Sequence, residues 1–203
     1  MAGKLIVFEG IDGSGKSTQL ALLAGWLREQ GFSVLEVAEP GTTQLGQELR
    51  QLLLNKELHA QPLAECFMFL AARAQLVDEV LRPAIERGDV VLCDRYTLST
   101  LAYQSYGRGI AAHEATVAAC MLAVREVVPD LTICLDVSVD SRRRTAAAPD
   151  NIERRGVSYF DRVRIGYLCE MRKLPTLGKV IETDDRSIEQ VFEDVKAAAA
   201  EIL

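Results

Sequence analysis

The stretch Gly10-Ile11-Asp12-Gly13-Ser14-Gly15-Lys16-Ser17 decides the fold of this chain, and it follows directly on the apolar run 5–8. Its glycines let the backbone curl so that successive N–H groups point inward, which is how a loop binds a polyphosphate at the N-terminus of a helix. Lys16 can reach the β and γ oxygens of that phosphate, and Ser17 can place its hydroxyl on Mg2+. An apolar i, i+3, i+4, i+7 stripe follows and ends at Gly31, so strand, loop and helix stand in the required order. The stretch predicts a phosphate-binding loop; the alternative is a glycine-rich turn with a surface lysine.

Composition limits the class of protein. The chain has 203 residues, 49% of them hydrophobic, and is long enough to bury one full core. A net charge of −6 without a block of Lys and Arg argues against a nucleic-acid partner. Five widely spaced cysteines predict buried thiols in a reducing cytoplasm, and two histidines leave little material for a catalytic triad or a zinc site. No run predicts a signal peptide, a transmembrane span or other membrane partner.

Short apolar runs rich in β-formers recur along the chain, and each gap between them is long enough for a helix. The runs lie at 5–8, 33–37, 90–93, 131–135 and 179–181. This rhythm predicts an α/β fold with a five-stranded parallel sheet and helices on both faces. Two helical stripes are visible, at Leu63, Phe67, Leu70, Ala74, Val77 and Leu81, and at Ile188, Val191, Phe192, Val195 and Ile202. In such a sheet the ligand lies beyond the carboxyl ends of the strands, so the residues that follow each run are the candidates for binding and chemistry.

Polar residues follow the second, third and fourth runs. Asp94-Arg95-Tyr96 places a carboxylate that can hold Mg2+ through water beside an arginine that can clamp a phosphate. The alternative interpretation of this stretch is that Asp94 caps a helix and Arg95 is a surface charge. Glu39-Pro40-Gly41-Thr42-Thr43, with Arg50 one helical stretch beyond, suits a ligand site or a plain turn. Asp136 is expected to cap a helix.

Arg73 lies in a strongly apolar helix and has no acidic neighbour at helical spacing. Phe69 shares its face, and an aromatic ring beside a forked donor suits a planar base that carries oxygens. The alternative is an arginine that reaches a distant carboxylate or water. The stretch Ser99-Thr100-Leu101-Ala102-Tyr103-Gln104 offers hydroxyls and an amide, for capping or for contacts with the edge of a base.

Together these residues resemble the thymidylate kinase family, P-loop enzymes that phosphorylate dTMP to dTDP with ATP. The resemblance covers nearly the whole chain and rests on 8–13 with the phosphate-binding loop, 39–41, the 69–73 helix, 94–96, and the residues after it. It implies a three-layer P-loop kinase fold in one domain over 1–203, with a short lid insert at about 142–155. ATP and Mg2+ are the implied cofactors, and a cytoplasmic homodimer formed through helix faces is the implied state.

The resemblance also implies roles for individual residues. Lys16, Arg95 and Asp12 are the implied catalytic residues, and Ser17 and Asp94 (through water) hold the metal. The implied ATP-binding residues are Gly10, Ile11, Asp12, Gly13, Ser14, Gly15, Lys16, Ser17 and Thr18. The implied dTMP-binding residues are Asp12 at the sugar 3′-hydroxyl, Pro40 near the base methyl, Arg50 and Arg95 at the phosphate, Phe69 stacked on thymine, Arg73 at its edge, Tyr103 against the 2′ position, and Ser99, Thr100 and Gln104.

Some residues depart from the family pattern. Ala38 stands where an arginine is common and Thr42 where a second glycine is common. Gly13 gives the loop the bacterial form, in which a mobile lid supplies the basic residues. The lid here is short, and Asn151 stands where an arginine is frequent. Candidates for the missing charge are Arg142, Arg143, Arg144, Arg154 and Arg155, unless these are solvated helix charges. A deoxynucleoside kinase and a catalytically weak nucleotide-binding module are the alternative functions.

Overall fold

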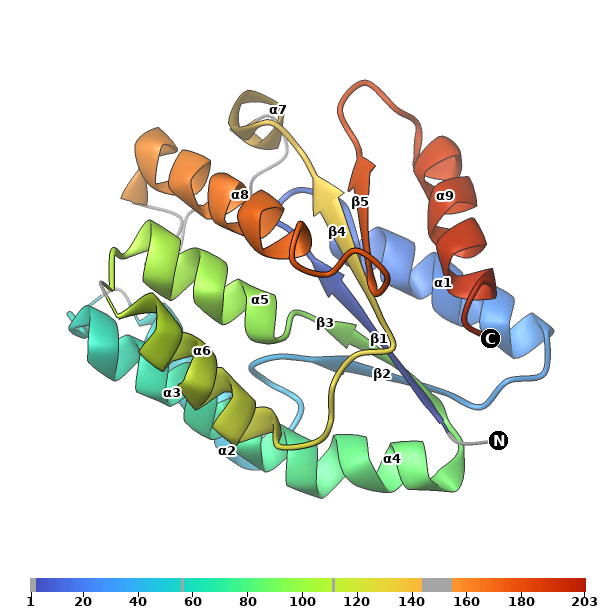
Figure 1. Ribbon diagram of the computed structural model, residues 1–203, viewed down its shortest axis with the longest axis horizontal. Coiled ribbons are helices and arrows are strands. Elements are labelled where there is room, and N and C mark those ends of the chain that lie inside the picture. Colours follow the sequence, from blue (N-terminus) through green and yellow to red (C-terminus); the bar gives the residue numbers. More distant parts are fainter. Residues whose placement is uncertain (1–2, 56, 111, 144–154) are drawn as a thin grey trace.

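Five parallel strands form the centre of the molecule (Figure 1). The structure is a computed structural model and describes residues 3–55, 57–110, 112–143 and 155–203. The strands are β1 (Lys4–Glu9), β2 (Val34–Ala38), β3 (Val90–Asp94), β4 (Leu131–Asp136) and β5 (Gly178–Glu182). Their order across the sheet is β2-β3-β1-β4-β5, and every neighbouring pair is parallel. The five apolar runs and the parallel sheet expected from the sequence are therefore confirmed.

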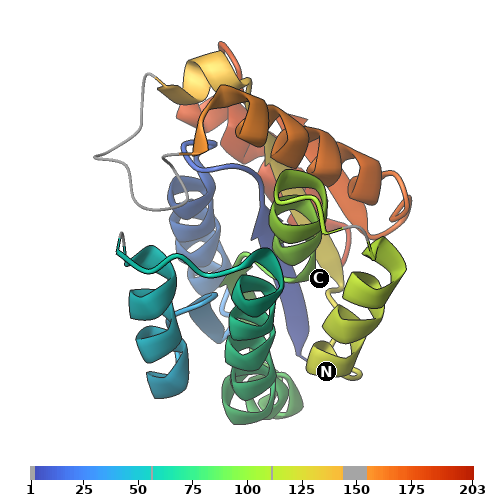
Figure 2. The same ribbon diagram turned by 90° about the vertical axis from the view of Figure 1, so that its left-hand side faces the viewer.

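Helices cover both faces of this sheet (Figures 1 and 2). One face is covered by α1 (Lys16–Glu29) and α9 (Ile188–Ala200). The other helices lie on the opposite side or at the carboxyl edge of the sheet, and α2 packs against α3. They are α2 (Gln44–Leu54), α3 (Pro62–Leu76), the π-helical turn η1 (Val77–Leu81), α4 (Arg82–Arg87), α5 (Thr97–Thr100), the π-helix η2 (Leu101–Gly107), α6 (His113–Val124), α7 (Val139–Arg143) and α8 (Val157–Met171).

The alternation of side chains along β1 divides the core in two. Ile6 and Phe8 are fully buried against α1 and α9, whereas Leu5 and Val7 are buried toward α3, η1 and α4. A third apolar cluster lies among α3, η2, α6 and α8 and includes Tyr103. Because both faces of β1 are dry, every residue from Leu5 to Glu9 is buried. The loop after Glu9 therefore starts from a strand that is buried on both faces.

The first of the two expected helical stripes is only partly correct. It describes the buried side of the helix from Leu70 onward, but Leu63 and Phe67 are 55% and 57% exposed. The first turns of α3 bury Glu65 and Cys66 instead, because they pack against η2, where Glu65 meets Gln104. The helix also widens into the π-turn η1 just before a proline, residue 83, which cannot continue regular α-helical hydrogen bonding.

Asp136 does not cap a helix, so that prediction is wrong. It ends β4, and α7 begins three residues later, at Val139. The Asp136 carboxylate instead accepts two hydrogen bonds from Arg164 of α8, at 2.6 and 2.8 Å. Ser138 takes the capping position and accepts from the backbone N–H of Ser141 at 3.3 Å. The ion pair connects the end of β4 to α8.

The cysteines agree with the expectation of free, mostly buried thiols. All five are unpaired; four are buried and Cys169 is half-buried. Among the helices that the structure describes, none has the length and apolar character needed to cross a membrane.

Candidate functional site

The phosphate-binding loop connects the buried end of β1 to the N-terminus of α1. Gly10 has φ 132°, and Gly15, at the N-cap of α1, has φ 92°, values that side-chain-bearing residues rarely adopt. A Cβ at Gly10 would lie 2.3 Å from the carbonyl oxygen of Leu135 on β4. Glycine at position 10 is therefore required both by conformation and by the neighbouring strand. The loop has the geometry expected of a phosphate cradle.

Lys16 folds over this loop. Its Nζ donates to the carbonyl oxygens of Gly10 and Ile11 at 3.0 and 3.1 Å, and the residue is 6% exposed. Burial, with a further contribution from the positive charge of Arg95, lowers the pKa of Lys16 to about 8. A polyphosphate in the loop would favour the charged ammonium.

Ser17 and Asp94 lie together at the carboxyl edge of the sheet. The Ser17 hydroxyl donates to Oδ2 of Asp94 at 3.2 Å. Asp94 Oδ1 is buried and has no hydrogen-bond partner in the part of the chain that the structure describes. A hydroxyl beside a carboxylate with a free oxygen is a suitable donor set for Mg2+, which prefers oxygen ligands. The two residues predicted for the metal are thus brought together, and they fit it.

Arg95 is held from several sides. Its NH2 donates to Asp12 Oδ1 at 2.6 Å, and its NH1 donates to the hydroxyls of Ser99 and Tyr167 at 3.2 and 2.9 Å. The guanidinium also lies 5.1 Å from the centre of the Tyr103 ring. The backbone of Arg95 has φ 74°, which is uncommon for a residue with a side chain and is typical of functional sites. The arginine is therefore preorganised, with 18% of its side chain accessible.

Glu9 is a residue of this site that the sequence reasoning did not single out. It is fully buried at the end of β1. Its Oε1 accepts from the backbone N–H groups of Tyr96 and Ser99 at 2.8 and 3.2 Å, and its Oε2 accepts from the hydroxyls of Ser99 and Tyr167 at 2.5 and 3.2 Å. These are the hydroxyls that contact Arg95. Two signals in the sequence pointed to Glu9: it directly follows the apolar run 5–8, and it lies within the stretch 8–13 on which the resemblance rests.

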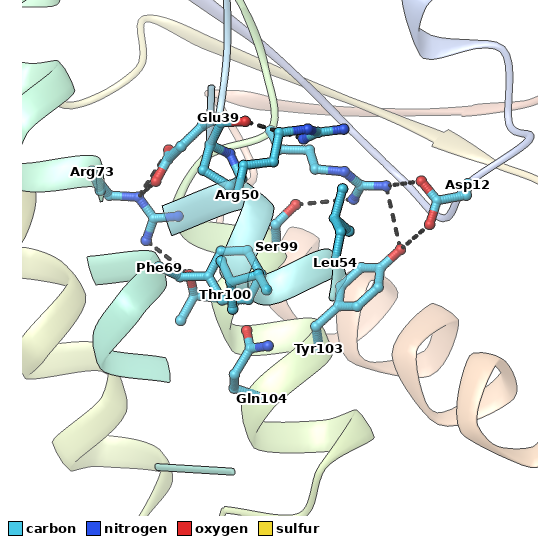
Figure 3. Close-up of a pocket in the computed structure, with 13 residues that line it drawn as sticks. Asp12, Glu39, Arg50, Leu54, Phe69, Arg73, Ser99, Thr100, Tyr103 and Gln104 are labelled. Carbon is cyan, nitrogen blue, oxygen red and sulfur yellow. Dashed lines mark hydrogen bonds and ion pairs between the residues drawn. The ribbon is translucent and has the colours of Figure 1, made fainter. Parts of the chain in front are cut away.

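One cavity contains all the residues that the resemblance implies for the acceptor (Figure 3). The lining comes from the loop after β1, the loop after β2, α2, α3, and the α5–η2 segment after β3. The lining residues predicted to bind dTMP are Asp12, Pro40, Arg50, Phe69, Arg73, Arg95, Ser99, Thr100, Tyr103 and Gln104. Leu53 and Leu54 were not predicted, and Glu39 was named only as part of the stretch 39–43.

Arg73 pairs with a carboxylate that is distant in the sequence, as the alternative to base binding predicted. Its Nε lies 2.7 Å from Glu39 Oε1, and both side chains are almost completely buried. Its NH1 donates to the Thr100 hydroxyl at 2.9 Å, and its NH2 donates to the carbonyl of Tyr96 at 2.8 Å. Arg73 also lines the cavity, next to Phe69 (Figure 3). A contact with a base and the ion pair with Glu39 are therefore compatible.

A second cavity adjoins the first and is lined by the phosphate-binding loop. Its members include Gly13, Gly15, Lys16, Ser17, Thr18 and Asp94. Arg50 and Arg95 line both cavities, so two cations stand at the junction. Arg50 is exposed and donates to the carbonyl of Pro40 at 3.0 Å. This junction is where two phosphate groups from different ligands would meet.

A third cavity lies on the other side of the loop. Its lining joins Gly13, Ser14 and Gly15 to the segment 183–188, which follows β5. The sequence reasoning missed this segment, although it follows the fifth apolar run and the rule for carboxyl ends of strands applies to it.

The lid candidates are only partly described. Arg144 and Arg154 lie outside the described residues, and Arg142 and Arg143 end α7. Arg155 forms an ion pair with Glu65 of α3 at 2.6 Å and donates to the hydroxyl of Tyr159 at 3.0 Å. Glu65 is a second buried carboxylate that the sequence reasoning did not single out.

Comparisons with known proteins identify the family of this chain. The family model "Thymidylate kinase" matches residues 8–195. A thymidylate kinase of Pelotomaculum thermopropionicum is 43% identical, over 100% of this chain and 95% of the relative. One from Synechococcus sp. strain CC9311 is 41% identical, over 97% and 95%. A crystal structure of thymidylate kinase from Ehrlichia chaffeensis superimposes with a TM-score of 0.81 at 32% identity and covers 98% of this chain and 99% of that chain, which confirms the P-loop kinase fold. The chain belongs to the thymidylate kinase family, whose members transfer the γ-phosphoryl group of ATP to dTMP.

Proposed function

We propose that this chain phosphorylates dTMP to dTDP with ATP in the two adjoining cavities, with Mg2+ at Ser17 and Asp94. The observation that carries the assignment of ligands to cavities is the junction, where Arg50 and Arg95 line both the loop cavity and the acceptor cavity. A triphosphate in the loop and a monophosphate in the acceptor cavity would bring their reacting phosphates together there. Family membership supports the same acceptor.

The chemistry is assigned mainly to positioning and charge. Phosphoryl transfer needs the nucleophilic and leaving oxygens in line, with positive charge around the transferred group. Lys16 and Arg95 supply that charge from the protein. Asp12, which is paired with Arg95 at 2.6 Å, faces the sugar of the acceptor. Bound Mg2+ would neutralise phosphate charge and orient the donor.

The acceptor base is assigned to the far end of its cavity. Phe69 provides a stacking surface and Arg73 a donor beside it, with Pro40 near the base methyl and Ser99, Thr100 and Gln104 around the base. Tyr103 lies against the sugar and is held by its hydroxyl, which donates to Asp12 Oδ2 at 3.2 Å. The donor base is assigned to the third cavity, beside 183–188.

A coupled assay that follows ADP formation tests the proposal. The purified protein with ATP and Mg2+ is expected to turn over with dTMP, and Lys16→Ala is the control that removes the charge of the loop. A deoxynucleoside kinase would prefer thymidine, which lacks the phosphate that Arg50 and Arg95 face. A weak nucleotide-binding module would bind both nucleotides in calorimetry without turnover. Either result would overturn the assignment.

The lid insert at about 142–155 within a single domain over 1–203 remains a prediction, and so does the identity of its basic residue. Arg155 is already engaged by Glu65. We also assign the protein to the cytoplasm, on the basis of its five free thiols.

We propose a homodimer formed through α2, α3 and α6. Large apolar side chains are exposed on all three helices, which lie side by side (Figure 2). They include Leu45 and Leu52 at 45% and 48%, Phe67 at 57% and Leu122 at 79%. Contiguous exposed apolar surface marks interaction sites. Light scattering is expected to give a dimer for the parent protein and a monomer for Phe67→Glu; a monomeric parent would contradict the proposal.

A further inference from the structure

Gln104 presents an amide to the acceptor cavity, and the two ends of that amide have opposite chemistry. The residue is 1% exposed and lies on η2. Figure 3 shows its amide directed toward Phe69 and Thr100. Its Nε2 donates to Glu65 Oε1 at 3.1 Å. Which end faces the base decides whether the site offers a donor or an acceptor.

Glu65 determines that orientation. Its carboxylate is 4% exposed, and Arg155 contacts both oxygens, at 3.2 and 2.6 Å, while Arg108 lies 3.6 Å from Oε1. A carboxylate between two guanidinium groups only accepts hydrogen bonds. Gln104 must therefore turn its NH2 toward Glu65 and its oxygen the other way. No hydrogen bond to that oxygen comes from the part of the chain that the structure describes.

We propose that Glu65 is a positioning residue that sets base selectivity by fixing the Gln104 carbonyl as an acceptor toward the base. Thymine and uracil carry an N–H at ring position 3, which such a carbonyl accepts. Cytosine carries an unprotonated nitrogen at that position, whose lone pair would face the carbonyl oxygen. A buried polar group left unpaired in this way is strongly disfavoured. The inference rests on the proposed placement of the acceptor base in this cavity.

The test compares two acceptors that differ only at the base edge. dUMP and dCMP both lack the 5-methyl group, so the ratio of their kcat/KM values reports the edge contact alone. Their dissociation constants from calorimetry replace kcat/KM if dCMP is not turned over. Glu65→Gln is expected to lower the dUMP:dCMP ratio about tenfold, because the new amide can donate and lets Gln104 reverse. The dTMP:dUMP ratio, which reports the methyl contact, is expected to stay unchanged.

Glu170→Gln is the matched control. Glu170 is another glutamate whose side chain is 4% exposed, bound by Lys173 and Tyr106, and it does not line the acceptor cavity. It is expected to leave both ratios unchanged. In a Gln104→Met background, Glu65→Gln is expected to have no further effect on the dUMP:dCMP ratio.

Two results would overturn the inference. The first is an unchanged dUMP:dCMP ratio in Glu65→Gln, and the second is an equal drop in the Gln104→Met background. If Glu65→Gln does not fold, Glu65→Asp replaces it. The shorter side chain keeps the negative charge but moves the carboxylate away from Gln104, so the dUMP:dCMP ratio must fall in this variant as well. A parent protein that fails to phosphorylate dTMP would refute the proposed function instead, so the two failures are distinguishable.

Discussion

Replacing Glu9 with Gln tests whether the buried carboxylate at the end of β1 holds Arg95 in place. Glu9 accepts from the hydroxyls of Ser99 and Tyr167 at 2.5 and 3.2 Å, and both hydroxyls accept from Arg95 NH1. A Gln oxygen can keep the two backbone N–H groups that Glu9 Oε1 now binds. The amide nitrogen would then face the two hydroxyls, which could no longer donate to it.

The size of the effect follows from those two bonds. A hydrogen bond to a charged group contributes about 1.5–3 kcal/mol and a neutral one about 0.5–1.5 kcal/mol. Glu9→Gln exchanges two hydrogen bonds to a charged carboxylate for two neutral ones. It is therefore expected to lower the free energy of unfolding by roughly 2–3 kcal/mol. Arg95 would also lose its fixed position, so kcat for dTMP is expected to fall about tenfold or more while KM for ATP changes little.

Urea unfolding, followed by circular dichroism, measures the stability, and the coupled assay measures kcat. Glu36→Gln is the control, because Glu36 forms an exposed ion pair with Arg28 at 2.8 Å. Such surface pairs contribute at most about 1 kcal/mol. Two results would contradict this prediction. One is a loss of less than about 0.5 kcal/mol in the free energy of unfolding of Glu9→Gln, a value typical of surface substitutions; the other is a kcat equal to that of the parent protein.

Three further predictions concern the loop and β4. Since burial lowers the pKa of Lys16 to about 8, ATP affinity measured by calorimetry is expected to fall as pH rises above 8, where the ammonium loses its proton; Lys16→Arg should remove this dependence. Gly10→Ala is expected to cost several kcal/mol of stability in urea titrations, because its Cβ would lie 2.3 Å from the Leu135 carbonyl; soluble protein of parental stability would contradict this. Asp136→Asn is expected to lower Tm by several degrees by weakening the pair with Arg164, and an unchanged Tm would show that the pair contributes nothing.

Local pattern was sufficient for most of the fold. The five strands needed only short apolar runs, and the phosphate-binding loop needed only glycines at fixed spacing between a strand and a helix. Errors arose where burial depends on a neighbour that spacing does not identify. Phe67 looks like a core residue by periodicity, but the packing of α3 against η2 leaves it exposed. Asp136 looks like a cap by position, but it pairs with Arg164 of α8.

The candidate site shows the same division. Arg73 and Arg155 were predicted, but their pairing with particular carboxylates was not, because each partner lies far away in the chain: Glu39 is 34 residues from Arg73, and Glu65 is 90 from Arg155. The sequence around a residue that acts by orienting another side chain contains no motif that would reveal this role. Only the folded arrangement shows that Gln104 is oriented by a glutamate on a different helix.

The position of β1 at the centre of the sheet has a consequence for how the protein is made. β1 is synthesised first, but its neighbours are β3 and β4, so Ile6 pairs with Leu92 and Leu131. At about 5–20 residues per second, a ribosome takes roughly 4–17 s to advance from Ile6 to Leu92 and roughly 6–25 s to reach Leu131. Until β3 has been made, β1 and the loop attached to it have no neighbouring strand to pair with, and β4 becomes available only after that. Such long-range pairing slows folding, so we expect the nascent chain to depend on chaperones more than its final stability suggests.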